Sequence, residues 1–252
     1  MLRYSISILF LLCFSIGWAQ DEQINLNPQD TLVQKQTYGL RVGLDLSRLI
    51  IAQTDDDYSG LEIVGDYRLT QKLFIAGELG NEKKTKQEDL YNFTTSGSYI
   101  KIGVDYNTYE NWYGMNNAIF IGGRYAYSSL SQTLNNFQYF DTNRYWNPDT
   151  FPIGSAEAIE YDGLNASWLE FVVGLKAELF ANIYLGGSVR IGFLMNTKEA
   201  EEFPNLFIPG FNKVTDDSKF GVGYNYSLTY MIPLYKKAKK KKVLEIENQN
   251  EE

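Results

Sequence analysis

The amino-acid sequence predicts an all-β protein: an eight-stranded antiparallel up-and-down transmembrane β-barrel with short periplasmic turns and long extracellular loops. Three observations predict this fold. Apolar and polar residues alternate with a period of two in eight segments, the connections between these segments are alternately short and long, and the polar set combines glycine with charges of both signs. The composition agrees, because 15% of the residues are aromatic and 21 are glycine.

The first 19 residues are expected to be a cleaved signal peptide. A positive charge, Arg3, precedes an apolar run over residues 6–16, and small residues stand three and one positions before a cut after Ala19. A membrane-spanning helix needs about 20 apolar residues, more than this run supplies. Cleavage would remove Cys13, the only cysteine, so no disulfide is expected in the mature chain. Residues 20–37 would then form a periplasmic N-terminal segment.

The barrel itself is predicted over residues 38–235. Its strands are expected at residues 38–47, 61–69, 73–80, 100–106, 119–128, 169–179, 183–195 and 220–232. In each strand one set of alternate residues is apolar. In strand order these sets include Leu40 and Val42; Ile63 and Tyr67; Ile75 and Leu79; Ile102 and Val104; Ile119 and Tyr125; Phe171 and Val173; Val189 and Ile191; and Tyr224 and Leu228. Pro233 has no backbone N–H for the ladder near the end of the closing strand, so the sequence leaves the lower boundary of that strand open.

The connections place all the long loops at one end of the barrel. Long connections cover residues 48–60, 81–99, 129–168 and 196–219, and shorter ones lie at residues 70–72, 107–118 and around Phe180. This arrangement is typical of outer-membrane barrels. We therefore expect an outer-membrane localisation, with outer-membrane lipid and the outer-membrane assembly machinery as partners. The charged tail, residues 236–252, is expected to be disordered in the periplasm.

The glycines indicate which face of the strands points inward. Gly43, Gly103, Gly122 and Gly192 share a face with the charged residues, and a narrow lumen needs a small residue beside each long charged one. The charged set is therefore predicted to form a structural network inside the lumen. Its members are Arg41, Asp45, Glu62, Asp66, Arg68, Glu78, Lys101, Asp105, Arg124, Glu170, Lys176, Glu178 and Arg190. Because the side chains of eight strands fill such a lumen, no open pore is expected.

Two alternatives stay open. A soluble periplasmic lipocalin-like barrel would show the same alternation, with its apolar face inward around an apolar ligand. The second alternative is a barrel-embedded lipid-modifying enzyme. The aromatic residues favour the membrane: Tyr38, Tyr67 and Tyr106 lie at the short-turn ends of their strands, and Tyr125 and Tyr224 lie toward the long-loop ends. Two such girdles are expected where a lipid band meets water.

The composition excludes several classes of function. A formal net charge of −8 disfavours a nucleic-acid partner. With no histidine, Ser-His or Cys-His catalysis and His-ligated zinc are excluded. Paired carboxylates do not stand in a recognisable catalytic spacing, Gly-rich phosphate motifs are absent, and the Asp55-Asp56-Asp57 run lacks the spacing of a calcium loop. We expect neither enzymatic activity nor a cofactor or metal site.

The long loops are the expected binding surface. They are acidic in sum, and the loop over residues 129–168 is also rich in aromatic residues, among them Phe140, Trp146 and Phe151. An acidic rim repels anions and attracts divalent or basic partners. The barrel is therefore expected to be structural or to bind an unknown partner or ligand through these loops.

Several stretches resemble an uncharacterised family of Bacteroidota outer-membrane β-barrel proteins, a domain of unknown function. They are YGLRVGLDLS at 38–47, EIVGDY at 62–67, ELGNEKK at 78–84, GSYIK at 97–101, YENW at 109–112, SQTLN at 131–135, IPGFNK at 208–213 and FGVGY at 220–224. The resemblance covers residues 38–237. It implies the barrel fold and provides no catalytic or binding residue.

Overall fold

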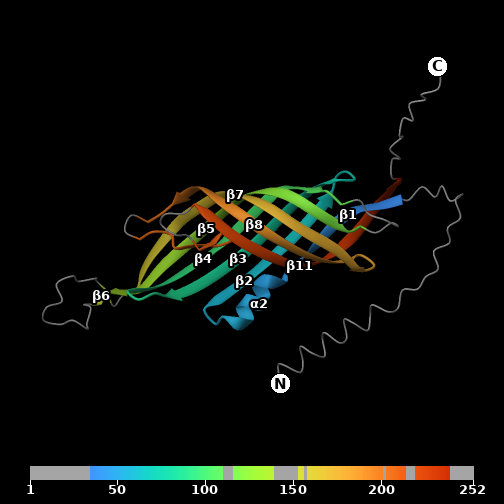
Figure 1. Cartoon of the computed structure of the whole chain (residues 1–252). Helices are drawn as coiled ribbons and strands as arrows, with labels where there is room; N and C mark the ends of the chain where they lie inside the picture. The colour runs from blue at the N-terminus through green and yellow to red at the C-terminus, as the bar shows by residue number, and fades with distance from the viewer. Residues whose placement is uncertain are drawn as a thin grey trace, which may run out of the picture. The chain divides into compact units, whose positions relative to one another are not determined.

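The computed structural model describes residues 35–109, 116–138, 153–155, 158–200, 203–213 and 219–238. Within these ranges, eight long strands form one closed antiparallel ring (Figure 1). They are β1 (Lys35–Asp45), β2 (Tyr58–Arg68), β3 (Leu73–Gln87), β4 (Tyr91–Asn107), β5 (Ala118–Gln138), β7 (Ile159–Phe180), β8 (Ile183–Lys198) and β11 (Phe220–Ala238). Each strand pairs with the next one named, and β11 closes the ring on β1. The predicted number and antiparallel order of strands are confirmed.

Four short elements are additional to the ring. Helix α2 (Leu46–Thr54) follows β1 directly, and β6 (Ile153–Ser155) pairs with the end of β5. Strands β9 (Phe207–Ile208) and β10 (Asn212–Lys213) pair with each other between β8 and β11. In the described ranges, no helix is long and apolar enough to cross a membrane. The predicted signal peptide and most of the predicted N-terminal segment lie outside these ranges.

The two faces of the strands separate as the glycines predict. The outward-facing Leu40, Phe171 and Val189 are 38%, 52% and 57% exposed, whereas Arg41 and Arg190 are 4% and 7% exposed. Charged side chains therefore line the inside of the ring. The structure does not favour the soluble lipocalin-like alternative, because such a barrel encloses its apolar side chains.

Every strand of the ring contributes to an exposed apolar belt. Its members are Leu40, Val42, Leu44, Leu61, Ile63, Ile75, Leu79, Ile100, Ile102, Val104, Ile119, Ile121, Tyr125, Leu169, Phe171, Val173, Leu175, Leu185, Val189, Ile191, Val222, Tyr224, Tyr226, Leu228 and Ile232. These residues alternate along each strand with the enclosed ones, because successive side chains point to opposite faces.

The last strand, β11, continues past residue 232, where the sequence placed its end. The register shifts there, so that Tyr38 faces Tyr235 and Gly39 faces Pro233. Such a bulge accommodates a proline in the ladder, and β11 continues to Ala238, into the tail that the sequence predicted to be disordered. Tyr38 was expected in the exposed girdle; it is buried instead, because Tyr235 stacks on its ring at 5.3 Å and the Arg68 guanidinium lies 4.7 Å above it.

Two of the expected long loops are largely strand. Strands β3 and β4 pair continuously up to Gln87 and Asn92, and β5 and β7 pair far beyond the apolar belt. Polar contacts line these extensions: the hydroxyls of Thr85 and Thr94 lie 3.0 Å apart, and Asn135 Nδ2 donates to Thr94 Oγ1 at 2.9 Å. Since neither face of an extension is uniformly apolar, the period-two pattern does not reveal these strands.

The segment after β1 is a helix where strand and loop were expected. Asp45 caps α2, because its carboxylate accepts from the backbone N–H and the hydroxyl of Ser47 at 2.8 and 2.7 Å. This turn ends β1 early. Pairing with β1 begins only at Ser227 on β11 and at Ile63 on β2.

The early end of β1 leaves a gap in the strand pairing of the ring. On the β1 side, and within the described part of the chain, residues 221–226 of β11 and 58–62 of β2 have no strand partner. We call this gap the lateral seam. Helix α2 contacts both of its edges and lies beside β2 (Figure 1).

Candidate functional site

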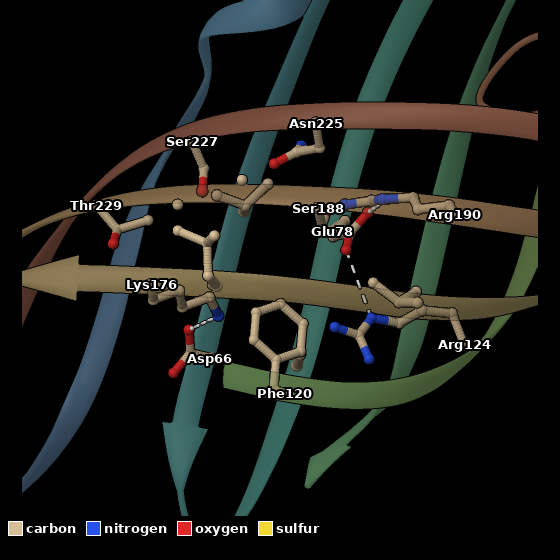
Figure 2. Close-up of a pocket in the computed structure, with 17 residues that line it drawn as sticks. Asp66, Glu78, Phe120, Arg124, Lys176, Ser188, Arg190, Asn225, Ser227 and Thr229 are labelled. Atoms are coloured by element: carbon tan, nitrogen blue, oxygen red, sulfur yellow. Dashed lines mark hydrogen bonds and ion pairs between the residues drawn. The ribbon is translucent and has the colours of Figure 1, made fainter. Parts of the chain in front are cut away.

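Ion pairs cross the half of the lumen nearer the short turns. The Asp66 carboxylate binds two cations, Arg41 Nε at 2.7 Å and Lys176 Nζ at 2.6 Å. Lys176 also lies 3.9 Å from Asp105 Oδ2, whose partner Arg124 contacts Asp105 Oδ1 at 2.7 Å. Figure 2 shows Asp66 and Lys176 facing each other across the interior from β2 and β7. The two contacts of Lys176 connect β7 to β2 and β4, which are not its neighbours in the ring, whereas Arg41–Asp66 and Arg124–Asp105 join neighbouring strands.

The pairs continue through the centre of the lumen. Glu78 of β3 binds Arg190 of β8, and Arg124 lies near it in Figure 2. Lys101 Nζ lies 2.9 Å from Glu170 Oε1 and 3.9 Å from Glu78 Oε2. A continuous cluster of nine residues results, which we call the lumen network: Arg41, Asp66, Glu78, Lys101, Asp105, Arg124, Glu170, Lys176 and Arg190.

A second ionic cluster lies behind α2. Arg48 Nη1 contacts Glu82 Oε1 at 2.9 Å, and Arg48 Nε lies 3.8 and 3.7 Å from carboxylate oxygens of Glu62 and Asp45. The Tyr99 hydroxyl donates to Glu62 at 2.5 Å. Glu62, Glu82 and Asp45 have no exposed surface, so their charges depend on these partners. We call Arg48, Asp45, Glu62 and Glu82 the latch cluster.

The sequence did not reveal Arg48 and Glu82 as interior residues. Both stood in segments predicted to be loops. Glu82 had a usable signal, because it continues the inward-facing set of Glu78 by two further steps of two. Arg48 had a weaker one: it stands three residues after Asp45, which is a preferred residue type at a helix N-cap.

Two residues predicted for the charge network serve the short-turn end instead. Arg68 donates to the backbone oxygens of Thr70 and Gln71 at 3.1 and 3.0 Å. The Glu178 carboxylate accepts from the backbone N–H of Asn182 at 3.3 Å and of Asn116 at 3.4 Å. The other eleven predicted residues lie in the lumen network or the latch cluster.

The enclosed charges are balanced. Among the described residues, six buried cations (Arg41, Arg48, Arg68, Lys101, Arg124 and Arg190), with Lys176, whose side chain is 13% exposed, meet seven buried anions (Asp45, Glu62, Asp66, Glu78, Glu82, Asp105 and Glu170). Balance is needed where water cannot screen a charge. The space between them is small: the cavity in Figure 2 has a volume of about 30 Å³. That is enough for one or two water molecules.

The half of the lumen nearer the long loops, which we call the upper lumen, is apolar and is filled by a segment of the chain itself. Residues 203–213, which we call the plug, bring Ile208 and Phe211 into a cluster with strand residues. The other buried members of this cluster are Tyr99, Ala126, Leu130, Leu164, Ala166, Trp168 and Leu194. Phe211 meets Trp168 edge to face at 5.5 Å, and the backbone N–H of Gly210 donates to Glu82 Oε2 at 2.9 Å. The plug is therefore held by both apolar packing and the latch cluster.

Glycines make room for the plug. A Cβ atom at Gly192 or Gly221 would lie 2.8 or 2.9 Å from the Phe211 ring. Gly210 has a φ of +83°, and a Cβ there would lie 2.6 Å from the Tyr99 ring. The glycines that the sequence predicted to accommodate charged neighbours thus also accommodate Phe211.

The side-chain chemistry of this site suits a structural role. The carboxylates of the lumen network and the latch cluster face cations or hydrogen-bond donors, and the described residues include no group of three or more His, Cys, Asp or Glu suited to a metal ion. Residues 139–152 of the loop over residues 129–168, which include the aromatic Phe140, Trp146 and Phe151 that the sequence singled out, lie outside the described ranges.

Comparison with known proteins gives a family. The family model for a domain of unknown function, DUF6048, matches residues 1–237. The chain belongs to the DUF6048 family. No curated protein matches it. The crystal structure of Acinetobacter baumannii CarO2 is similar to this DUF6048 chain with a TM-score of 0.41 and 10% identity, over 79% of this chain and 100% of that one. A similarity this weak carries no argument about function.

Proposed function

We propose that this DUF6048 chain is a small closed β-barrel of a Bacteroidota outer membrane. One observation carries the proposal: the apolar belt surrounds the whole ring, while balanced ions fill its interior. In water, such a belt would expose far more contiguous apolar surface than a soluble monomer tolerates. In a bilayer the same belt faces hydrocarbon, and the closed ring leaves few unpaired strand edges.

The barrel body is closed to solutes in this proposal. The lumen network, the latch cluster and the plug fill successive levels of the interior, and the cavities between them are the size of water molecules. Several ion pairs, such as Asp66 with Lys176 and Lys101 with Glu170, join strands that are not neighbours, so their role is to hold the ring together. The signal peptide cut after Ala19 and the extracellular position of the long-loop end belong to the same proposal.

We assign the biochemical role to the long-loop end of the barrel, which is extracellular in this proposal. Strands β4, β5 and β7 extend beyond the apolar belt, and aromatic residues gather where the plug meets them. Tyr91 and Phe203 meet edge to face at 5.6 Å, and Tyr161 stacks with Phe203 at 6.4 Å. An extended polar ribbon with an aromatic cluster suits a structural or partner-binding role, and we propose no catalysis.

Membrane fractionation tests the proposal. The full chain, expressed with its own N-terminal segment, is expected in the outer-membrane fraction, released only by detergent. Its electrophoretic mobility should change on boiling, because a folded barrel resists detergent until it is heated. Recovery in the soluble periplasmic fraction without detergent would contradict the proposal.

A further inference from the structure

The lateral seam breaks the ladder at the level of the apolar belt. Tyr226 and Tyr224 of β11 and Leu61 of β2 belong to the belt and lie on the seam's edges. The backbone N–H of Tyr226 is satisfied by the Asp45 carboxylate at 3.2 Å rather than by a strand. Backbone groups at alternate positions of a strand point to the same side, so those of Tyr224 and Val222 also face the seam.

Helix α2 covers this seam with a side that continues the belt. Ile50 is 57% exposed, whereas Ser47 and Arg48 of the same helix are buried. The backbone N–H and C=O groups of α2 bond to one another within the helix. The helix therefore cannot supply the strand-to-strand hydrogen bonds that β1 supplies nearer the short turns. Its inner side is held by the latch cluster, chiefly by the 2.9 Å contact of Arg48 with Glu82.

The space directly inside the seam is already shaped for an apolar group. The ring of Phe211 lies against Gly221, which belongs to the unpaired part of β11. A cavity of about 10 Å³ adjoins it, lined by Phe211, Tyr224, four glycines (Gly192, Gly210, Gly221 and Gly223) and the ionic residues Arg48, Lys101, Glu170 and Arg190. The cavity thus lies where the plug and the unpaired part of β11 meet the lumen network and the latch cluster.

We propose that α2 closes a lateral doorway, and that an acyl chain of an outer-leaflet lipid enters through it to take the place of the Phe211 ring. The inference rests on the proposed membrane location. Three neighbouring features support it. The barrel wall lacks strand pairing at the level of the belt, and α2 covers this part of the wall with its apolar side outward. The Phe211 ring of the plug lies directly behind it among glycines. Hydrocarbon is the ligand chemistry, because the belt outside the seam is apolar and the Phe211 ring inside it packs against Trp168, Gly192 and Gly221.

The latch cluster would set how often the doorway opens. Glu82 accepts from Arg48 of α2 and from the backbone of Gly210 in the plug at 2.9 Å each. One carboxylate therefore holds both the cover of the seam and the group behind it. Weakening this carboxylate's contacts should release both together.

Photolabelling from the bilayer tests the inference. The full chain is reconstituted in vesicles whose phospholipid carries a diazirine at the end of one acyl chain, and labelled peptides are quantified after irradiation. The R48Q/E82Q variant removes the latch ion pair without changing net charge. We expect label on the peptide containing Phe211 to rise at least fivefold over the unmodified chain, relative to label on the belt peptide containing Val173.

Two further variants make the result specific. R41Q/D66N removes a buried 2.7 Å pair of the same type in the lower lumen, and should leave Phe211 labelling unchanged. R48K keeps the charge but loses the planar contacts of arginine, and should give a smaller rise if the double variant does not fold. Boiling-dependent mobility reports folding in each case.

The outcomes separate the two proposals. Label on Val173 but no rise at Phe211 in either folded latch variant would overturn the doorway and leave the membrane location standing. Absence of label at Val173 would remove the membrane location itself. Cross-links between two copies through residues 221–226, with no label there, would show that a second chain covers the seam and would also overturn the doorway.

Discussion

Arg48 and Glu82 form an ion pair at 2.9 Å between α2, the helix that follows β1, and the long-loop half of β3. Glu82 also accepts from the Tyr58 hydroxyl at 2.9 Å. Both residues lay in segments that the sequence predicted to be loops. The pair nevertheless joins three parts of the upper barrel, because the backbone of the plug shares the same carboxylate.

Removing one member of this pair should destabilise the barrel. Glu82→Ala leaves Arg48 with fewer buried partners, and we expect the free energy of unfolding to fall by about 3–5 kcal/mol. Replacing both residues, R48M/E82M, should cost less than the two single changes together. Urea unfolding of the barrel in vesicles measures the free energy of unfolding of each variant.

A surface pair serves as the control for that experiment. Lys86 and Glu88 form an ion pair whose side chains are 38% and 37% exposed. Glu88→Ala should change the free energy of unfolding by less than about 1 kcal/mol, because solvent screens the pair. Strictly additive losses for Arg48 and Glu82 would contradict their coupling.

The glycines against the plug should not accept a methyl group. Gly221→Ala places a Cβ 2.9 Å from the Phe211 ring, and such overpacking is expected to cost about 1–3 kcal/mol. Phe211→Ala should relieve the clash, so that the double variant loses less stability than the sum of the singles. Gly123→Ala is the control, since its Cβ would lie 3.9 Å from the backbone oxygen of Glu170, an ordinary van der Waals distance.

The apolar belt should reject charge only where lipid is expected. Val173→Arg, at a belt residue that is 44% exposed, should lower the stability of the barrel in vesicles by about 2–4 kcal/mol, because arginine near the bilayer centre loses its hydration. Asn136→Arg, exposed on the extension of β5, should have little effect. Equal small losses at both positions would indicate that the belt does not contact hydrocarbon.

The filled lumen should not conduct ions. The unmodified chain, reconstituted in a planar bilayer, is expected to give no stable single-channel steps, since side chains of the lumen network bridge the interior and leave a cavity of about 30 Å³. A general porin prepared in the same way provides the positive control. Reproducible steps that depend on the amount of this chain would disprove a closed lumen.

The predictions succeeded where a strand has one apolar and one charged face. Val173 and Lys176 illustrate this, because their parity alone assigned them to opposite faces of β7. The predictions failed at the extension that contains Thr94, where neither face is uniformly apolar and pairing is specified by the neighbouring strand. They also failed at Tyr38, whose burial depends on Tyr235, a residue almost two hundred positions away in the chain.

By itself, the sequence determined the eight-stranded ring, its inward and outward faces, and most members of the charge network, because the two-residue period fixes each of these locally. Tertiary structure decided where β1 ends, which loop enters the barrel and which carboxylate Arg48 meets. A short helix with an aspartate cap competes with a strand at residues 46–54, and only packing of α2 against β2 and β11 selects the helix. Contacts between Phe211 and Gly221 likewise arise only once the ring has closed, since closure brings the plug against β11.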